Sequence, residues 1–255
     1  MPISFFKYFP APKYIGMPHV GFDISSNAIR YIELVKSPKG LTLGRFGTQD
    51  LSTPVVFDDK LASNQDLVLS LKKLQKTNRF NFVEISIPEE KAYLFTMEIP
   101  SGESEAVRNH IEFHLEENVP IALADAVFDY HIIKKGNKKG VDFASVSVVP
   151  RVVIEDYISL FEKCGMTPVS FLIENQAITR SIIGMEDLDT YLVVNIGRTK
   201  TVLSIVSEQA VQFTSTVNIG GEDFATAIAK ENSISKEEAE KMIRDKGFSR
   251  TENNN

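Results

Sequence analysis

Two stretches of this chain share one pattern of apolar and polar positions. Residues 21–34 and residues 192–206 each begin with an apolar strand that ends in a short acid or amide, Asp23 in the first and Asn195 in the second. A tight turn of small polar residues and a second apolar strand follow in both. This order is typical of a β-hairpin, and the second stretch is a weaker copy of the first.

The pattern after the first hairpin predicts the rest of an α/β unit. We expect a third antiparallel strand over 40–47, a loop over 48–63, a helix beginning after Asn64, and a strand over 82–87. Asn64 is a favourable helix N-cap, and Leu67, Leu71 and Leu74 follow it at helical spacing. The predicted order is therefore a three-stranded meander, a helix and a strand.

Residues 88–149 are predicted to form an insertion with a small sheet of its own. Strands are expected over 92–99, 126–133 and 143–149, with a helix over 104–118 between the first two and a turn over 136–140. Val107, Ile111 and Leu115 make one apolar face of that helix. The insertion should therefore bury a core separate from that of the flanking unit.

The remaining pattern predicts the end of the first unit and a second one. A helix over 151–163, a strand over 168–173, a helix over 174–183 and a polar linker over 184–189 come first. After the second hairpin, a strand over 210–217 repeats the meander, and Gly220-Gly221 opens a helix. The last helix should begin at Ser235, because Glu238 completes a capping box there.

The two hairpin turns have the composition of an anion site. Small residues let several backbone N–H groups point into one concavity, and such nests bind anions. Asp23 could hold a hydrated magnesium ion, because this ion takes few protein ligands. Gly220-Gly221, at a helix start, would expose further free N–H groups. Two facing hairpins could clamp a polyphosphate, although ordinary core hairpins carry polar turns as well.

Composition narrows the class of protein. The net charge of −6 and the lack of a Lys/Arg run argue against broad nucleic-acid affinity. The single cysteine, Cys164, excludes an intramolecular disulfide and fits a small core residue in a reducing compartment. No apolar stretch approaches a membrane-spanning length. The aromatic residues 1–10 lack the apolar region of a signal peptide and indicate a lead or a surface anchor.

One helix raises the alternative of a metal site. His110 and His114 are four residues apart, the spacing of a zinc-binding pair. The acid of this helix is Glu112, which does not directly follow the first histidine, so the metalloprotease pattern is not met. Asp129 or His131 would have to supply a third ligand, and nothing in the sequence places either nearby. A solvated helix face is the favoured interpretation.

Several motifs carry a family resemblance. The run from Asp23 to Arg30 resembles the first phosphate motif of the actin, sugar-kinase and heat-shock-chaperone superfamily, which normally contains Asp-x-Gly. Ile219-Gly220-Gly221-Glu222-Asp223-Phe224 is similar to the Gly-Gly-x-Asp-Phe element of those chaperones. The acidic helix end with Pro120 and the strand Phe128-Asp129-Tyr130 resemble PilM, the actin-like family of type IV pilus assembly proteins related to FtsA. The resemblance covers nearly the whole chain.

The resemblance implies an α/β architecture of the actin-like, ribonuclease H-like ATPase fold. It implies an N-terminal lead over 1–18, a first lobe over 19–87 and 150–186, an inserted SHS2-like subdomain over 88–149, and the start of a second lobe over 187–255. The chain stops before the family's later Gly-Gly adenosine loop. The second lobe is therefore expected to be incomplete.

The resemblance also implies a site for ATP with Mg²⁺, the ion being held by Asp23. The nucleotide-binding residues would be Asp23, Ser25, Ser26, Asn27, Asn195, Gly197, Arg198, Thr199, Gly220 and Gly221. Ser25 stands where the family has glycine, and Asn195 replaces the aspartate of the second motif. We therefore expect weak or lost ATP binding, no catalytic residues and no working ATPase.

In the PilM family, the N-terminal peptide of the membrane protein PilN docks as an extended segment between the first lobe and the insertion. The resemblance thus implies a cytoplasmic scaffold of the pilus assembly platform, peripheral on the inner membrane through a PilN-like partner. Other platform proteins are further expected partners, nucleic acid and a membrane span are not expected, and self-association is left open. The alternatives are an FtsA-like cell-division protein, which should carry a C-terminal amphipathic helix that 251–255 does not show, an active actin-fold ATPase or kinase, and a type II secretion scaffold.

Overall fold

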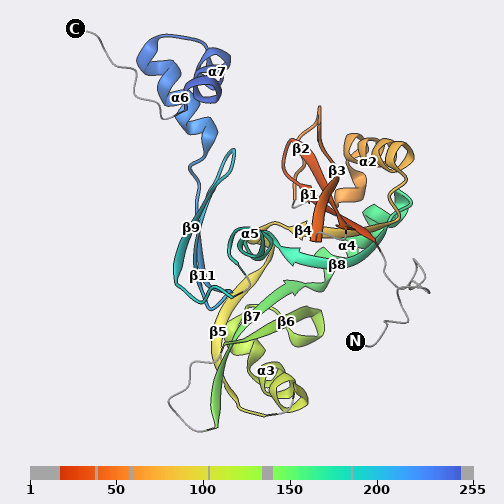
Figure 1. Ribbon diagram of the computed structural model, residues 1–255, viewed down its shortest axis with the longest axis vertical. Helices are drawn as coiled ribbons and strands as arrows, with labels where there is room; N and C mark the ends of the chain where they lie inside the picture. The colour runs from red at the N-terminus through yellow and green to blue at the C-terminus, as the bar shows by residue number, and fades with distance from the viewer. Residues whose placement is uncertain are drawn as a thin grey trace. The chain divides into compact units, whose positions relative to one another are not determined.

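The computed structural model describes residues 18–37, 40–57, 60–102, 104–133, 140–184 and 186–247. The chain forms two compact units, Met1–Ser181 and Ile182–Asn255, and each is described by itself (Figure 1). Residues 1–17 of the expected lead, most of the predicted 136–140 turn and the polar end 251–255 lie outside the described residues.

A five-stranded sheet forms the centre of the first unit. Its strand order is β3 (Gly40–Asp50), β2 (Ala28–Ser37), β1 (His19–Ile24), β4 (Phe82–Ile87) and β8 (Thr167–Ile173). β1 to β3 form an antiparallel meander, whereas β4 runs parallel to both β1 and β8. Alternate side chains of β1, those of Val20, Phe22 and Ile24, are buried on one face, as a strand period of two requires.

Two helices cover that face of the sheet. α2 (Gln65–Asn78) and α4 (Arg151–Lys163) pack their apolar stripes against β1, β2 and β4 in one core cluster (Figure 1). The predicted cap is confirmed, because the Asn64 side chain accepts a hydrogen bond from the Leu67 N–H at 3.0 Å. Cys164 is buried in the same cluster, in agreement with the prediction that it is a small core residue.

The 88–149 segment forms a second, three-stranded sheet in the same unit. Its order is β5 (Tyr93–Pro100), β7 (Val141–Pro150) and β6 (Ala126–Ile133), so β6 is an edge strand. α3 (Ser104–Asn118) packs Val107, Ile111 and Leu115 on one face of this sheet, as predicted (Figure 1). Short 3₁₀ turns lie at η2 (Leu61–Ser63), η3 (Glu89–Lys91) and η4 (Leu123–Asp125). α5 (Glu174–Ile182) follows β8, and the first unit ends at Ser181 in its last turn.

The loop predicted over 48–63 is wrong at both ends. β3 continues through Asp50, because Asp50 is paired with Ala28 across the ladder to β2. A 3₁₀ turn occupies Leu61–Ser63. Polar residues 48–50 carry no strand signal of their own, so the partner strand determines their conformation.

The second unit contains a three-stranded antiparallel meander and two helices. The strand order is β11 (Ala210–Val217), β10 (Thr201–Ser207) and β9 (Tyr191–Ile196), followed in the chain by α6 (Gly221–Asn232) and α7 (Lys236–Lys246). The predicted capping box is confirmed: the Glu238 N–H donates to Ser235 Oγ at 3.2 Å, and the Ser235 N–H donates to Glu238 Oε2 at 2.9 Å.

Candidate functional site

The first hairpin turn offers two backbone donors. The Ser25 N–H closes the turn by donating to the Ala28 carbonyl at 2.9 Å. The N–H groups of Ser26 and Asn27 make no hydrogen bond within the described part of the chain. Two adjacent free N–H groups at a tight turn are a small nest for an anion. The predicted site residues of this hairpin are therefore brought together.

The carboxylate of Asp23 already has a cationic neighbour. Asp23 and Arg30 are directly opposite in the β1–β2 ladder, and the guanidinium lies 3.2 Å from Asp23 Oδ2. The same guanidinium donates to Ser25 Oγ at 3.3 Å. Both charged side chains are partly exposed. The carboxylate predicted to hold Mg²⁺ is thus next to an arginine. The sequence did not indicate that Arg30 belongs to the site.

The second hairpin repeats the backbone of the first one. The Gly197 N–H closes its turn by donating to the Lys200 carbonyl at 2.8 Å, while the N–H groups of Arg198 and Thr199 make no hydrogen bond among the described residues. The residue opposite Asn195 in the ladder is Val202. The second turn therefore lacks the acid and base pair that the first turn carries.

The expectation that Gly220-Gly221 would expose free N–H groups is wrong. The N–H groups of Gly221 and Glu222 donate to the carbonyls of Gly197 and Arg198 at 3.0 and 2.9 Å. The Gly220 N–H donates to a carboxylate of its own helix at 2.8 Å. The start of α6 is therefore used to support the second turn. Whether these two glycines bind nucleotide stays a prediction.

The arginine of the second turn is paired inside the second unit. The Arg198 guanidinium donates to Glu222 Oε1, and Lys236 Nζ lies 3.5 Å from the other oxygen of that carboxylate. The hydrogen bond from Arg198 is the main cause that lowers the pKa of the Glu222 carboxyl below its ordinary value of 4.5. Arg198 is therefore held against α6 in this conformation.

The predicted nucleotide residues thus form two separate groups. Asp23, Ser25, Ser26 and Asn27 lie in the first unit, and the other six, from Asn195 to Gly221, lie in the second unit. Each group is a coherent turn. The clamp between the two hairpins stays a prediction.

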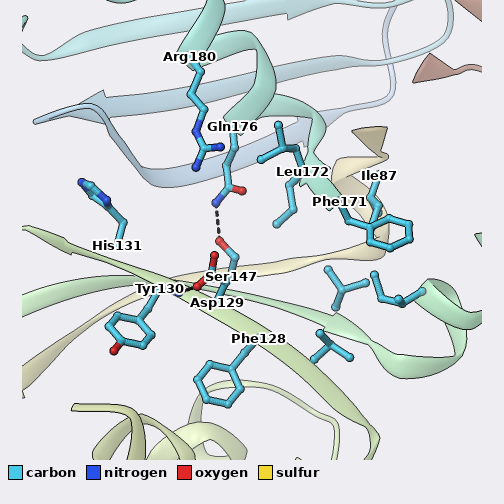
Figure 2. Close-up of a pocket in the computed structure, with 14 residues that line it drawn as sticks. Ile87, Phe128, Asp129, Tyr130, His131, Ser147, Phe171, Leu172, Gln176 and Arg180 are labelled. Carbon is cyan, nitrogen blue, oxygen red and sulfur yellow. Dashed lines mark hydrogen bonds between the residues drawn. The ribbon is translucent and has the colours of Figure 1, made fainter. Parts of the chain in front are cut away.

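A second candidate site is a pocket of about 290 Å³ in the first unit, shown in Figure 2. Its floor is the face of the β6–β7 sheet opposite α3, and β8 and α5 lie across from that floor. The lining side chains come from β4, β6, β7, α4, β8 and α5. The pocket therefore lies between the three-stranded sheet β5–β7–β6 and the segment formed by β8 and α5.

The pocket has an apolar part and a polar part. Phe171 and Ile173 of β8 line it together with Val127 and Val149 of the insertion. On the polar side, Gln176 Nε2 donates to Ser147 Oγ at 2.5 Å and ties α5 to the insertion sheet (Figure 2). An amphipathic lining of this kind suits an elongated ligand that is neither wholly apolar nor wholly charged.

Two charged side chains of the pocket are not paired with each other or with another charged group of the described chain. Arg180 on α5 and Asp129 on β6 both line the pocket, and no ion pair involves either of them. Figure 2 shows Arg180 projecting from α5 on the same side as Gln176. These two groups can therefore bind charged or polar atoms of a ligand.

The strand Phe128-Asp129-Tyr130 divides its roles by face. The Phe128 ring lies under the Arg108 guanidinium at 4.6 Å, and Tyr130 Oη lies 3.0 Å from Ser104 Oγ, so both hold α3 to the sheet. Phe128 and Tyr130 therefore contact α3, whereas Asp129 lines the pocket.

Sequence reasoning missed Gln176 and Arg180. Their signal was present: they are four residues apart and therefore lie on one face of the helix predicted over 174–183. The sequence did not show that this face lines a pocket with β6 and β8.

The histidine pair is a feature of the α3 surface. The rings of His110 and His114 are 4.7 Å apart, and His114 Nδ1 lies 2.9 Å from a Glu117 carboxylate oxygen. No group of three or more His, Cys, Asp or Glu residues that could hold a metal occurs in the described ranges. In the same ranges, no helix is both long enough and apolar enough to cross a bilayer.

The chain matches a known family over most of its length. Residues 21–255 match the family described as "Type IV pilus assembly protein PilM". A solved PilM–PilN type IV pilus biogenesis complex has a chain that superposes with a TM-score of 0.72 at 17% identity, covering 89% of this chain and 69% of that one.

Two further solved structures share the fold. The cytoplasmic domain of EpsL, an inner membrane component of the type II secretion system of Vibrio cholerae, gives a TM-score of 0.51 at 14% identity, covering 92% of this chain and 78% of that one. The ethanolamine utilization protein EutJ from Carboxydothermus hydrogenoformans gives a TM-score of 0.50 at 16% identity, covering 89% of this chain and 61% of that one. The family match and these neighbours place the chain in the PilM family of type IV pilus assembly proteins, with the actin-like ATPase fold.

Proposed function

We propose that this protein is a scaffold of the type IV pilus assembly platform that binds the extended N-terminal peptide of a PilN-like inner-membrane protein. The observation that carries the proposal is the pocket between the insertion sheet and β8 with α5. The structural similarity to a PilM–PilN complex supports it. Recruitment through such a partner would hold the protein at the inner membrane without a span of its own.

The pocket suits an extended peptide better than a compact ligand. It is bordered by β6, which is an edge strand of its sheet, and edge strands offer unpaired backbone groups to an added strand. Val127, Asp129 and His131 alternate along β6 on the pocket face. A peptide in extended conformation would place every second side chain into the pocket.

The division of the lining predicts the chemistry of the peptide. Apolar side chains would pack against Phe171, Ile173 and Val127, where burial removes their surface from water. Polar or charged groups would lie near Asp129 and Arg180. The partner segment is therefore amphipathic, with apolar anchors and at least one polar anchor.

A charge placed in the apolar part tests this proposal. Val127→Glu puts a carboxylate where the peptide's apolar side chain would be buried, and an unpaired buried charge is costly. We expect the Kd for a synthetic peptide copying the N-terminus of the PilN-like partner to rise by at least about tenfold in calorimetry.

Ile132→Glu is the matched control. Ile132 is on the same strand with a similar exposed fraction, 39% against 37% for Val127, and it does not line the pocket. Its Kd should stay within about twofold of the parent value, well under 1.4 kcal/mol. Equal binding by the parent and by Val127→Glu, with both proteins folded by circular dichroism, would overturn the peptide site.

We infer further that nucleotide binds weakly and through the first hairpin. The free N–H groups of Ser26 and Asn27 and the nearby Arg30 guanidinium fit a phosphate group. Asp23 fits Mg²⁺ less well, because it is already adjacent to that arginine. A bound nucleotide would supply negative charge for these groups. Its role would be to shift a conformational equilibrium, without being turned over by catalysis.

A further inference from the structure

The second face of the five-stranded sheet carries an exposed apolar patch. The face opposite α2 and α4 presents Ile32 and Leu34 on β2 and Leu41, Leu43 and Phe46 on β3. Ile32 is paired with Phe46 and Leu34 with Leu43, so the side chains form a contiguous cross-strand patch. Phe46 is 64% exposed and Leu34 is 55% exposed. Contiguous patches of this kind on a folded protein mark binding surfaces.

The patch continues into a pocket at the centre of the sheet. α5 covers the β4 and β8 end of the same face and leaves a pocket of about 390 Å³. Ile32 belongs both to the patch and to the pocket lining, next to Gly21 of β1. Because they share Ile32, the pocket and the patch form one continuous surface from α5 to the edge strand β3, which we call the groove.

The rim of this groove is acidic. Asp23, Glu84 and Glu174 line the pocket, and Arg30, its basic lining residue, is adjacent to Asp23. An occupant that complements this surface would carry apolar side chains and positive charge.

Residues 1–17 of this chain have that composition. They contain Phe5, Phe6, Tyr8, Phe9, Tyr14 and Ile15 with Lys7 and Lys13. No acidic residue precedes Asp23 in the sequence. An aromatic, basic segment is thus joined directly to the first strand of the sheet.

The attachment point is on the correct face. His19 lies on the same side of β1 as Gly21 and Asp23, and its Nε2 is 3.4 Å from Glu84 Oε2, at the pocket rim. Seventeen extended residues reach about 56 Å at roughly 3.3 Å per residue. The edge strand β3 is two strand spacings from β1, about 10 Å. The segment is therefore long enough to cross the patch.

We propose that residues 1–17 bind in this groove, with aromatic side chains against the patch and lysines toward the acidic rim. The contact covers the apolar face of the sheet from within the same chain. This intramolecular contact is independent of the peptide pocket on β6.

Hydrogen exchange read by mass spectrometry tests the contact in the full chain. Phe5→Ser with Phe6→Ser removes two anchors and keeps the segment length. Exchange of residues 28–50 should become at least about fivefold faster, since about 1 kcal/mol of protection is lost. Phe113→Ser, on the exposed surface of α3, is the matched control and should leave exchange in 28–50 unchanged.

A second arm adds a synthetic peptide of residues 1–17 to the full chain that carries Phe5→Ser and Phe6→Ser. The peptide should restore protection of residues 28–50, and Phe46→Ser in the receiving chain should weaken this binding by at least about tenfold. Unchanged exchange in the double variant would overturn the proposal. Protection that rises with protein concentration would do so too, since a second copy would then be the occupant. Peptide binding to anionic vesicles without any protection of 28–50 would assign the segment to a membrane surface and also overturn it.

Discussion

The hairpin of the first unit and the hairpin of the second unit share a backbone plan and differ in their charged side chains. Each turn is closed by the same hydrogen bond, from the Ser25 N–H to Ala28 and from the Gly197 N–H to Lys200. Each leaves the next two N–H groups free among the described residues. Across the ladder, however, the first hairpin pairs an acid with an arginine, whereas the second has Val202 at the corresponding place.

The supports of the two turns differ as well. Loop N–H groups of Leu51 and Val55 donate to the carbonyls of the first turn. The first N–H groups of α6 do the same for the second turn. The backbone therefore sets the turn geometry in both hairpins, whereas an acid paired with an arginine across the ladder occurs only in the first.

The largest effect should come from the close contact that supports the second turn. A Cβ atom at Gly220 would lie 2.5 Å from the Arg198 carbonyl oxygen, a backbone atom that cannot move without opening the turn. Gly220→Ala should therefore destabilise the second unit by roughly 3 kcal/mol, the upper range for overpacking. Hydrogen exchange of residues 191–232 measures the loss.

Gly221→Ala is the control for this change, one residue further along. A Cβ atom there would be 3.7 Å from the nearest atom, an ordinary contact, so stability should change by less than about 0.5 kcal/mol. Equal effects of the two substitutions would show that the contact between the turn and α6 is not what holds the second hairpin.

The fold was predictable where the pattern is local. Asn64 and the leucines after it, and Ser235 with Glu238, predict their helices correctly because caps and helical spacing are properties of neighbouring residues. The end of β3 was not predictable, because Thr48, Gln49 and Asp50 are polar and become a strand only through pairing with β2.

The sites were predictable only in part. Asp23 and the small turn residues are visible in the sequence as a motif. The contact of Asp23 with Arg30 depends on hairpin register, and the pocket that holds Arg180 depends on the packing of distant segments. Free N–H groups at Gly220-Gly221 were wrongly expected, because the sequence does not show that the second turn occupies them.

The second largest effect should come from removing the positive charge of Arg30 in the first hairpin. Arg30→Ala removes the cation beside the free N–H groups of the first turn. We expect it to weaken ATP binding without Mg²⁺ by about tenfold in calorimetry, the loss of about 1.4 kcal/mol. Lys200→Ala, a basic residue in the second turn, should change the Kd by less than about twofold. A larger effect at Lys200 would place the dominant anion contact in the second hairpin and reverse the comparison.

The smallest effect concerns the carboxylate that holds Arg198 against α6. The Arg198 guanidinium lowers the pKa of Glu222, so the ionised carboxylate stabilises the folded state above its ordinary pKa of 4.5, and this stabilisation is lost as pH falls through the lowered value. Glu222→Gln should cost about 0.5 kcal/mol at pH 7, as expected of a surface ion pair, and the difference from the parent should vanish at the acid end of a pH series of urea unfolding curves.

Glu231→Gln, on the same helix and without an ion pair in the described chain, should show no difference at any pH. If Glu222→Gln also strengthens ATP binding, the guanidinium of Arg198, released from Glu222, has become available to the phosphates at the second turn. A persistent stability difference at low pH would instead show that Glu222 supports the turn through packing and not through its charge.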